Sequence, residues 1–150
     1  ITAANASSIS DGASALVLTR ESSLAGRDPL AQIVAHATHS IHPSEFTLAP
    51  IGAIEKLLAK TGWDLDSVDL FEINEAFAMV TMLTSQSLGL DPAKVNVFGG
   101  ACAQGHPIGS TGSRLIVTLA HAMKNQGKKR GIAALCIGGG EATAVALERN

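Results

Sequence analysis

Three side chains that could take part in chemistry stand close to apolar segments of the chain. Asn74 directly follows the apolar run Leu70–Ile73, Cys136 lies near the end of another apolar run, and His106 stands in a glycine-rich segment. An imidazole exchanges protons near neutral pH, a thiol can act as an acid, a base or a nucleophile, and an amide can donate hydrogen bonds to a developing negative charge. If these groups meet, they indicate an enzyme that moves protons and stabilises an anion.

Each of the three residues also has a simpler interpretation. Asn74 precedes a helical pattern, and asparagine is a common helix N-cap. Cys136 could be no more than a small buried side chain of an apolar strand. His106 is harder to explain in this way, because a polar ring flanked by Gly105 and Pro107 belongs to no apolar stripe. The residues by themselves leave both interpretations open.

Strands and helices that alternate along the chain must position these residues. Apolar runs bounded by glycine, proline and polar residues predict strands, and apolar residues at helical spacing between Pro50 and Gly62 predict a helix. A short buried strand is predicted at 13–18, and further strands at 30–37, 70–73, 95–98, 132–137 and 143–147. The predicted helices lie at 50–62, 77–89 and 113–126.

From residue 30 onward the predicted order is βαβαβαββ, which favours an α/β fold with a five-stranded mixed sheet covered by helices on both faces. Gly138–Gly140 should turn the chain into a final antiparallel hairpin. Because the carboxyl ends of parallel strands lie at one edge of such a sheet, we expect Asn74, His106 and Cys136 to face a common cavity there.

Composition restricts the possible functions. The chain has 150 residues, 46% of them hydrophobic, and a formal net charge of −2, which fits one main core. The basic cluster Lys128–Arg130 is short and lacks aromatic residues, so we expect no nucleic-acid partner. No apolar run is long enough to span a membrane, and we expect no membrane partner. Cys102 and Cys136 lack Cys-x-x-Cys spacing, which favours a reducing compartment, either a bacterial cytoplasm or an organelle matrix.

Two other kinds of site compete with this interpretation. The glycine-rich segment could be taken for a phosphate loop of a nucleotide-binding domain, but it lacks the lysine of a Walker motif. His36 and His39 would point to opposite faces of one strand, so they do not converge with His42 on a metal ion. No second pair of ligands completes a site around Cys102 and His106. We therefore expect no bound metal.

Three segments resemble the C-terminal signatures of the thiolase family, in family order and spacing: NEAFA at 74–78, GGACAQGHPIGSTGSR at 99–114 and CIGGGEA at 136–142. The opening NASSISDGASALVL resembles the segment in which a thiolase completes its N-terminal half. The resemblance implies a thiolase-like fold, with residues 1–28 ending the loop region and N-terminal half and residues 29–150 forming the C-terminal domain. Because the chain starts with Ile1, we expect it to be a piece of a longer polypeptide.

The thiolase resemblance implies acyl transfer by Claisen condensation or by its reverse, thiolysis. Such an enzyme interconverts a 3-oxoacyl-CoA and CoA with acetyl-CoA and a shorter acyl-CoA, and the CIGGG ending favours acetoacetyl-CoA as the substrate. CoA thioesters are then the ligands, with no permanently bound cofactor. The nucleophilic cysteine of the family lies in an N-terminal half that this sequence lacks. We therefore expect that half as a partner, inactivity of residues 1–150 alone, and a homodimer or homotetramer in the full enzyme.

The same resemblance implies roles for four catalytic residues. His106 matches the histidine that activates the nucleophile and presents a ring N–H to the thioester oxygen. Asn74 matches the asparagine that holds a water molecule as the second donor. Cys136 matches the acid/base that exchanges a proton with the acetyl methyl group, and the Gly138 N–H matches a donor in a second oxyanion hole.

Two further residues are implied to contact the substrate, and one nearby residue is not. Ser7 matches a serine beside the pantetheine arm, and Phe46 matches an apolar residue that lines the acyl pocket. Cys102 stands where the family usually has an apolar residue, so we assign it no role. The alternative function is a non-catalytic thiolase-like module that binds acyl-CoA or lipid, but such a module has no need for an amide, an imidazole and a thiol together.

Overall fold

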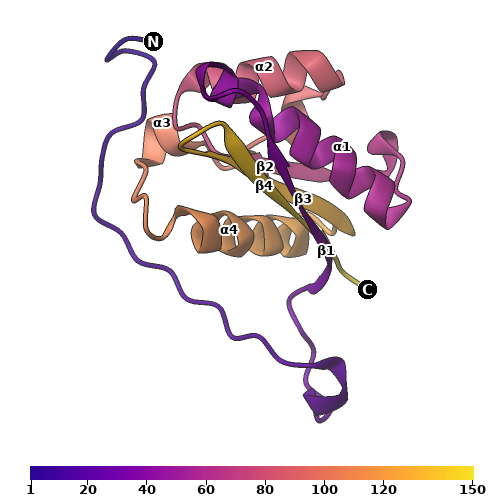
Figure 1. Ribbon diagram of the computed structural model, residues 1–150. Coiled ribbons are helices and arrows are strands. Elements are labelled where there is room, and N and C mark those ends of the chain that lie inside the picture. The colour runs from indigo at the N-terminus through magenta and orange to yellow at the C-terminus, as the bar shows by residue number, and fades with distance from the viewer.

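The apolar segments form four strands and four α-helices in a computed structural model that describes residues 1–150. In chain order these are β1 (Gln32–Ser40), α1 (Ala49–Thr61), β2 (Leu70–Ile73), α2 (Ala78–Leu88), α3 (Ala101–Gln104), α4 (Thr111–Asn125), β3 (Arg130–Ile137) and β4 (Glu141–Glu148). Four short 3-10 helices accompany them: η1 (Glu21–Ser23), η2 (Pro43–Leu48), η3 (Leu65–Ser67) and η4 (Pro92–Lys94). The helices lie on both faces of one sheet (Figure 1).

The sheet has four strands in the order β1-β4-β3-β2. Strands β3 and β4 form the expected antiparallel hairpin, with Ile137 opposite Glu141, and β4 also pairs antiparallel with β1. Strand β2 runs parallel to β3, with Ile73 opposite Ala134. The sheet is therefore mixed, as predicted, and the carboxyl ends of β2 and β3 lie at the same edge.

Alternating side chains of the strands build a separate core on each face of the sheet. One core joins α1 to the sheet through Ile54 and Leu57, which pack with Phe71 and Ile73 of β2. The other core joins α4 to the opposite face of the sheet through Leu119, which packs with strand residues such as Leu70 and Ala133. This alternation is what a sheet buried on both faces requires. It confirms the predicted α/β class with helices on both faces.

The prediction of a fifth strand at 95–98 is wrong. Val95 forms only an isolated parallel bridge with Phe71, and Asn96 then takes a left-handed φ of 48° that no strand residue has. The Asn96 N–H donates to the Phe71 carbonyl at 2.8 Å, and beyond this bond the Asn96 side chain pairs with β2 in place of the main chain. The Ile73 N–H donates to Asn96 Oδ1 at 2.8 Å, and Asn96 Nδ2 donates to the Ile73 carbonyl at 2.9 Å. An amide side chain therefore closes this edge of the sheet.

The predicted buried strand at 13–18 is also absent. These residues form no strand, and Val17 is 97% exposed. Figure 1 shows the N-terminal segment running outside the sheet before it reaches β1. An apolar segment becomes a strand only when a neighbouring strand completes its hydrogen bonds, and the four strands of this sheet pair among themselves. Composition alone could not reveal that this segment lacks a neighbour within the chain.

The helices begin and end close to the predicted positions. Helix α1 has Pro50 in its first turn and ends at Gly62, whose φ of 68° gives the left-handed C-cap. Helix α2 ends in the same way at Gly89, with a φ of 67°. None of the helices combines the length and apolar composition needed to cross a bilayer.

Candidate active site

The backbone on both sides of His106 is held in place. Helix α3 ends at Gly105, whose φ of 92° suits glycine, and a side chain there would collide with Ser10. The His106 N–H donates to the Ser8 carbonyl at 2.9 Å, and Ile9 forms an isolated bridge with His106. The N-terminal segment therefore fixes the position from which the imidazole projects.

The hydrogen bonds of the ring indicate which nitrogen of His106 carries the proton. His106 Nδ1 lies 2.7 Å from Thr111 Oγ1. Thr111 is fully buried in the first turn of α4 and donates its hydroxyl hydrogen to the Pro107 carbonyl at 3.0 Å. Because a hydroxyl has one hydrogen, Thr111 Oγ1 accepts a hydrogen bond from His106 Nδ1–H, which leaves Nε2 unprotonated in the neutral ring. His106 is thus arranged as a base at Nε2.

Asn74 lies on the Nε2 side of His106. Its Nδ2 is 3.4 Å from His106 Nε2, and its Oδ1 is 3.5 Å from Nη2 of Arg114. Both distances are long for hydrogen bonds, but a guanidinium can only donate, so the amide oxygen faces Arg114 and the amide nitrogen faces the ring. Asn74 is not a helix N-cap, because α2 starts at Ala78 with Phe77 at the cap position. The simpler interpretation of Asn74 is wrong.

The surroundings of His106 favour its neutral form. Burial lowers the pKa of His106, and the positive charge of Arg114 lowers it further. Glu72, on β2, is 1% exposed and its Oε1 has no hydrogen-bond partner. Burial raises the pKa of Glu72 to about 7, with Arg114 lowering it and Glu75 raising it. A neutral imidazole is the form that can accept a proton from a nucleophile.

Strand β3 brings Cys136 to the same edge of the sheet. The Asn74 N–H donates to the Ala134 carbonyl at 2.9 Å, and Cys136 follows Ala134 by two residues, opposite Ala142 in the hairpin. Burial raises the pKa of the Cys136 thiol, so the group is a neutral thiol near pH 7. The structure thus joins Asn74 to His106 and places Cys136 on the neighbouring strand, without a hydrogen bond between the thiol and either residue.

The other predicted site residues lie near the same end of the sheet. Gly138 is exposed at the tip of the hairpin and donates no backbone hydrogen bond, so its N–H is free. Ser7 Oγ donates to the Ala76 carbonyl at 2.9 Å. Phe46 meets Phe77 edge to face, with ring centroids 5.9 Å apart. In Figure 1, α3 and the turn between β3 and β4 lie at one end of the sheet and the C-terminus at the other. That any of them contacts a substrate stays a prediction.

Three residues of the cluster were missed in the sequence. Thr111 and Arg114 are three positions apart in the first turn of α4, on the face that meets His106 and Asn74. Glu72 precedes Asn74 by two residues and so lies on the same side of β2. A glutamate in the middle of a short buried strand was a signal that could have drawn attention to it.

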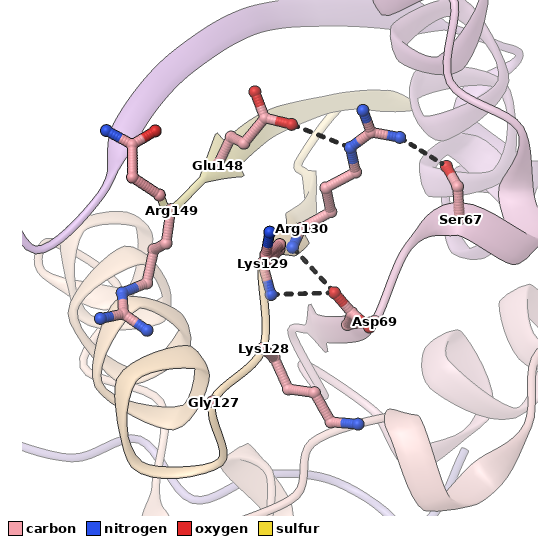
Figure 2. A pocket seen from close by; sticks show the side chains of 9 residues that line it. Ser67, Asp69, Gly127, Lys128, Lys129, Arg130, Glu148 and Arg149 are labelled. Atoms are coloured by element: carbon pink, nitrogen blue, oxygen red, sulfur yellow. Dashed lines mark hydrogen bonds and ion pairs between the residues drawn. The ribbon is translucent and has the colours of Figure 1, made fainter.

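The surface has two cavities of several hundred cubic ångströms. One, of about 630 Å³, is at the amino end of β2 and β3, and Figure 2 shows hydrogen bonds for Asp69, Arg130 and Glu148 in its lining but none for the side chains of Lys128 and Lys129. There Asp69 accepts two backbone N–H groups, and Arg130 binds Glu148 at 2.9 Å. The other, of about 540 Å³, lies beside α2. Neither is lined by His106 or Cys136, so the expected common cavity stays a prediction. No group of three or more His, Cys, Asp or Glu side chains is placed to hold a metal ion.

Chemically, the groups at this edge of the sheet can accept a proton at an imidazole, stabilise an anion and deliver a proton from a thiol. Comparison with known proteins identifies the family of the chain. The model of the thiolase C-terminal domain matches residues 27–149. The chain belongs to the thiolase family. The family inferred from the three sequence segments is therefore confirmed.

The similarity between this thiolase chain and its relatives covers almost its whole length. It is 48% identical to the cytosolic acetyl-CoA acetyltransferase of Rattus norvegicus and 48% identical to the acetyl-CoA acetyltransferase of Escherichia coli K12, covering 99% of this chain in both comparisons. The crystal structure of the Bacillus anthracis acetyl-CoA acetyltransferase superimposes with a TM-score of 0.94 at 44% identity, over 96% of this chain. Human mitochondrial 3-ketoacyl-CoA thiolase superimposes with a TM-score of 0.91 at 39% identity, over the whole chain.

The matched region is a minor part of each relative. This chain spans 38% of the length of the rat and E. coli proteins, and 37% and 38% of the Bacillus and human chains. The activity of the whole protein therefore remains a matter for proposal.

Proposed function

We propose that this chain supplies the C-terminal catalytic part of a thiolase, acting on CoA thioesters together with an N-terminal half that provides the nucleophilic cysteine. The observation that carries the proposal is the arrangement of His106, whose Nδ1 lies 2.7 Å from Thr111 Oγ1 and whose unprotonated Nε2 lies 3.4 Å from the amide nitrogen of Asn74. A histidine that served only the packing of the fold would not need an unprotonated ring nitrogen next to the buried amide of Asn74.

The acylation step follows from this arrangement. His106 Nε2 takes the proton of the cysteine thiol, and the thiolate attacks the 3-oxo carbonyl carbon of the substrate. The ring then carries a new Nε2–H, which donates to the thioester oxygen as negative charge develops there when the bond between C2 and C3 breaks. The Asn74 side chain supplies the second donor through a bound water molecule.

Cys136 has its role at the acetyl methyl group. When the bond between C2 and C3 of the 3-oxoacyl-CoA breaks, the electron pair stays on C2 and takes up the proton of the Cys136 thiol, giving acetyl-CoA. In the direction of synthesis, the Cys136 thiolate removes that proton again. The Gly138 N–H, which donates to no carbonyl within the chain, supplies a donor in a second oxyanion hole. The raised pKa of the Cys136 thiol fits a group that starts thiolysis as a proton donor.

Substrate preference and assembly are part of the same proposal. Phe46, which meets Phe77 edge to face, lines the acyl pocket, and the CIGGG ending at 136–140 favours acetoacetyl-CoA as the substrate. Ser7 lies beside the pantetheine arm, and no cofactor is permanently bound. The full enzyme is a homodimer or homotetramer in the cytoplasm or an organelle matrix, with residues 1–28 completing the other half and residues 29–150 forming the C-terminal domain.

The test uses the assembled enzyme, meaning residues 1–150 joined to an N-terminal thiolase half. Incubation with acetoacetyl-CoA without free CoA should leave an acetyl group on a cysteine of the N-terminal half, located by mass spectrometry of its peptides. His106→Ala should slow this labelling at least about a hundredfold. Binding of acetoacetyl-CoA without acylation of any cysteine would instead support the non-catalytic binding module.

A further inference from the structure

One arginine beside the Asn74–His106 pair has no part in the function proposed above. Arg114 is half-buried in the first turn of α4. Its Nη2 faces Asn74 Oδ1 at 3.5 Å, and its Nη1 donates to Gln104 Oε1 at 3.2 Å. Gln104 in turn donates to two carbonyls of the segment before α3, at 3.1 and 2.7 Å. Arg114 therefore connects the end of β2, the helix before His106 and the start of α4.

The hydrogen bonds that start at Arg114 can run in only one direction. A guanidinium donates and never accepts, and at the far end the Pro107 carbonyl accepts and never donates. Asn74 Oδ1 accepts from the arginine, and Asn74 Nδ2 then faces His106 Nε2. His106 Nδ1 donates to Thr111, which donates to the Pro107 carbonyl.

A rotation of the Asn74 amide by half a turn, which exchanges its oxygen and its NH2 group, would break this sequence of donors and acceptors. Its NH2 group would then face the guanidinium, donor against donor, and its oxygen would face His106 Nε2. An oxygen at that place favours the ring form with hydrogen on Nε2, which cannot accept a proton there. By selecting one orientation of the amide, Arg114 also selects the ring form with a free Nε2.

Arg114 acts on His106 through its charge as well. The charged side chain that faces the imidazole is Arg114 from α4, and Arg114 in turn faces the buried Glu72 of β2. Arg114 is the one whose charge lowers the pKa of His106, after the effect of burial. Arg114 Nε and Glu72 Oε1 are both buried without a hydrogen-bond partner, so part of the guanidinium is shielded from solvent.

We propose that Arg114 is a positioning residue of this thiolase site, which turns the amide of Asn74 toward His106 and thereby keeps His106 Nε2 free for the proton of the nucleophile. Arg114 itself contacts no reacting atom. The proposal rests on the proposed function, because it assumes that His106 acts as the base in acylation.

The experiment measures the rate of acylation against pH in the assembled enzyme, for the parent protein, Arg114→Met, Arg114→Lys and the control Lys124→Met. Lys124 is an exposed cation on the same helix, so its substitution removes a charge from α4 without touching the site. Arg114→Met should acylate about tenfold to a hundredfold more slowly, with KM for acetoacetyl-CoA unchanged. The rise of its rate with pH should move to higher pH. Arg114→Lys, which keeps a donor and the charge, should follow the parent pH profile, and Lys124→Met should match the parent in every respect.

If Arg114→Met keeps the pH profile of the parent, the proposal is overturned, whatever its rate of acylation. An alkaline shift in Arg114→Lys as large as that in Arg114→Met would also overturn it. If thermal unfolding shows that Arg114→Met does not fold, Arg114→Gln replaces it, because the glutamine amide can donate to Gln104 but carries no charge. The rate of Arg114→Gln should show the same alkaline shift, and its absence overturns the proposal. The two hypotheses fail differently. An assembled parent enzyme that is never acylated contradicts the proposed function, whereas an active parent with an unaffected Arg114→Met contradicts only the role of Arg114.

Discussion

His106 Nδ1 lies 2.7 Å from Thr111 Oγ1, and the hydroxyl hydrogen of Thr111 is bound to the Pro107 carbonyl at 3.0 Å. These two hydrogen bonds fix the orientation of the imidazole ring and determine which ring nitrogen carries the proton. Because Thr111 is fully buried, no water molecule can replace its hydroxyl without rearrangement. In the proposed mechanism, the role of His106 as a base therefore depends on the hydroxyl of Thr111.

Replacing this hydroxyl should impair catalysis more than folding. Thr111→Val keeps the shape of the side chain but leaves His106 Nδ1 without an acceptor, so acylation in the assembled enzyme should slow about tenfold to a hundredfold. Thr84→Val is the matched control, because Thr84 is also fully buried and donates to a backbone carbonyl, that of Val80, at 2.8 Å. Both variants should lose similar stability, about 1–3 kcal/mol, in thermal unfolding. An equal loss of acylation rate in both would show that Thr111 has only a structural role.

Cys136 should be needed for one half-reaction only. Cys136→Ala in the assembled enzyme should still be acylated by acetyl-CoA, but should no longer exchange the methyl protons of acetyl-CoA with deuterated solvent, because only that step needs the acid/base. The measurement is mass spectrometry of acetyl-CoA recovered from deuterated buffer. Cys102→Ala, which changes the other free cysteine of this chain, should exchange at the parent rate. Methyl exchange that survives in Cys136→Ala would remove this thiol from the mechanism.

Glu72 should make the protein less stable as the pH rises. Its pKa is raised by burial from the ordinary value of 4.5 to about 7, so the fold favours the protonated carboxyl. The stabilisation is fully present below pH 4.5 and is lost as the pH rises through about 7, a difference of about 3 kcal/mol at most. Glu72→Gln should therefore have a higher unfolding temperature than the parent at about pH 8, and a similar one at about pH 5.

The control for this effect is Glu55→Gln, which changes an exposed carboxylate of α1. It should follow the parent at both pH values. If Glu72→Gln is less stable than the parent at alkaline pH, the carboxylate is stabilised by Arg114 more than it is penalised by burial, and our account of this group is wrong.

The Asn96 side chain should protect the backbone amides of β2 from hydrogen exchange. Its side chain supplies two hydrogen bonds to Ile73, at 2.8 and 2.9 Å, where the expected fifth strand would have paired. In Asn96→Ala, amide hydrogen exchange of the peptide that contains Leu70–Ile73 should be about tenfold faster or more, because each lost bond contributes about 1 kcal/mol. Asn125→Ala, at an exposed position near the end of α4, should leave that peptide unchanged. Unchanged exchange in Asn96→Ala would mean that this edge is held by other contacts.

Sequence patterns were sufficient where local physics decides the structure. Pro50 and Gly62 marked both ends of α1, and the glycines at 138–140 marked the hairpin. The predicted strands at 13–18 and 95–98 failed because pairing depends on partners that a local pattern does not contain. At 95–98 an asparagine side chain took the place of a strand, and at 13–18 this chain provides no neighbouring strand.

The same distinction applies to the candidate site. The unusual position of His106 between glycine and proline drew attention to it, and the carboxyl-edge rule placed Asn74 and Cys136 at the same edge of the sheet. The hydrogen bonds of Thr111 and Arg114 to this pair could not be predicted, because they depend on how closely α4 approaches the end of β2. Residue types identified the chemistry, whereas packing determined which ring nitrogen is free.

The most direct test of the account is a comparison of acetoacetyl-CoA thiolysis by residues 1–150 alone and by the assembled enzyme. Cys102 and Cys136 cannot serve as the nucleophile in our account, so residues 1–150 alone should show no turnover. The assembled enzyme should turn over at about 1 per second or faster, a rate typical of enzymes. Turnover at such a rate by residues 1–150 alone would contradict the assignment of the nucleophile to the N-terminal half, and an inactive assembled enzyme would contradict the proposed function.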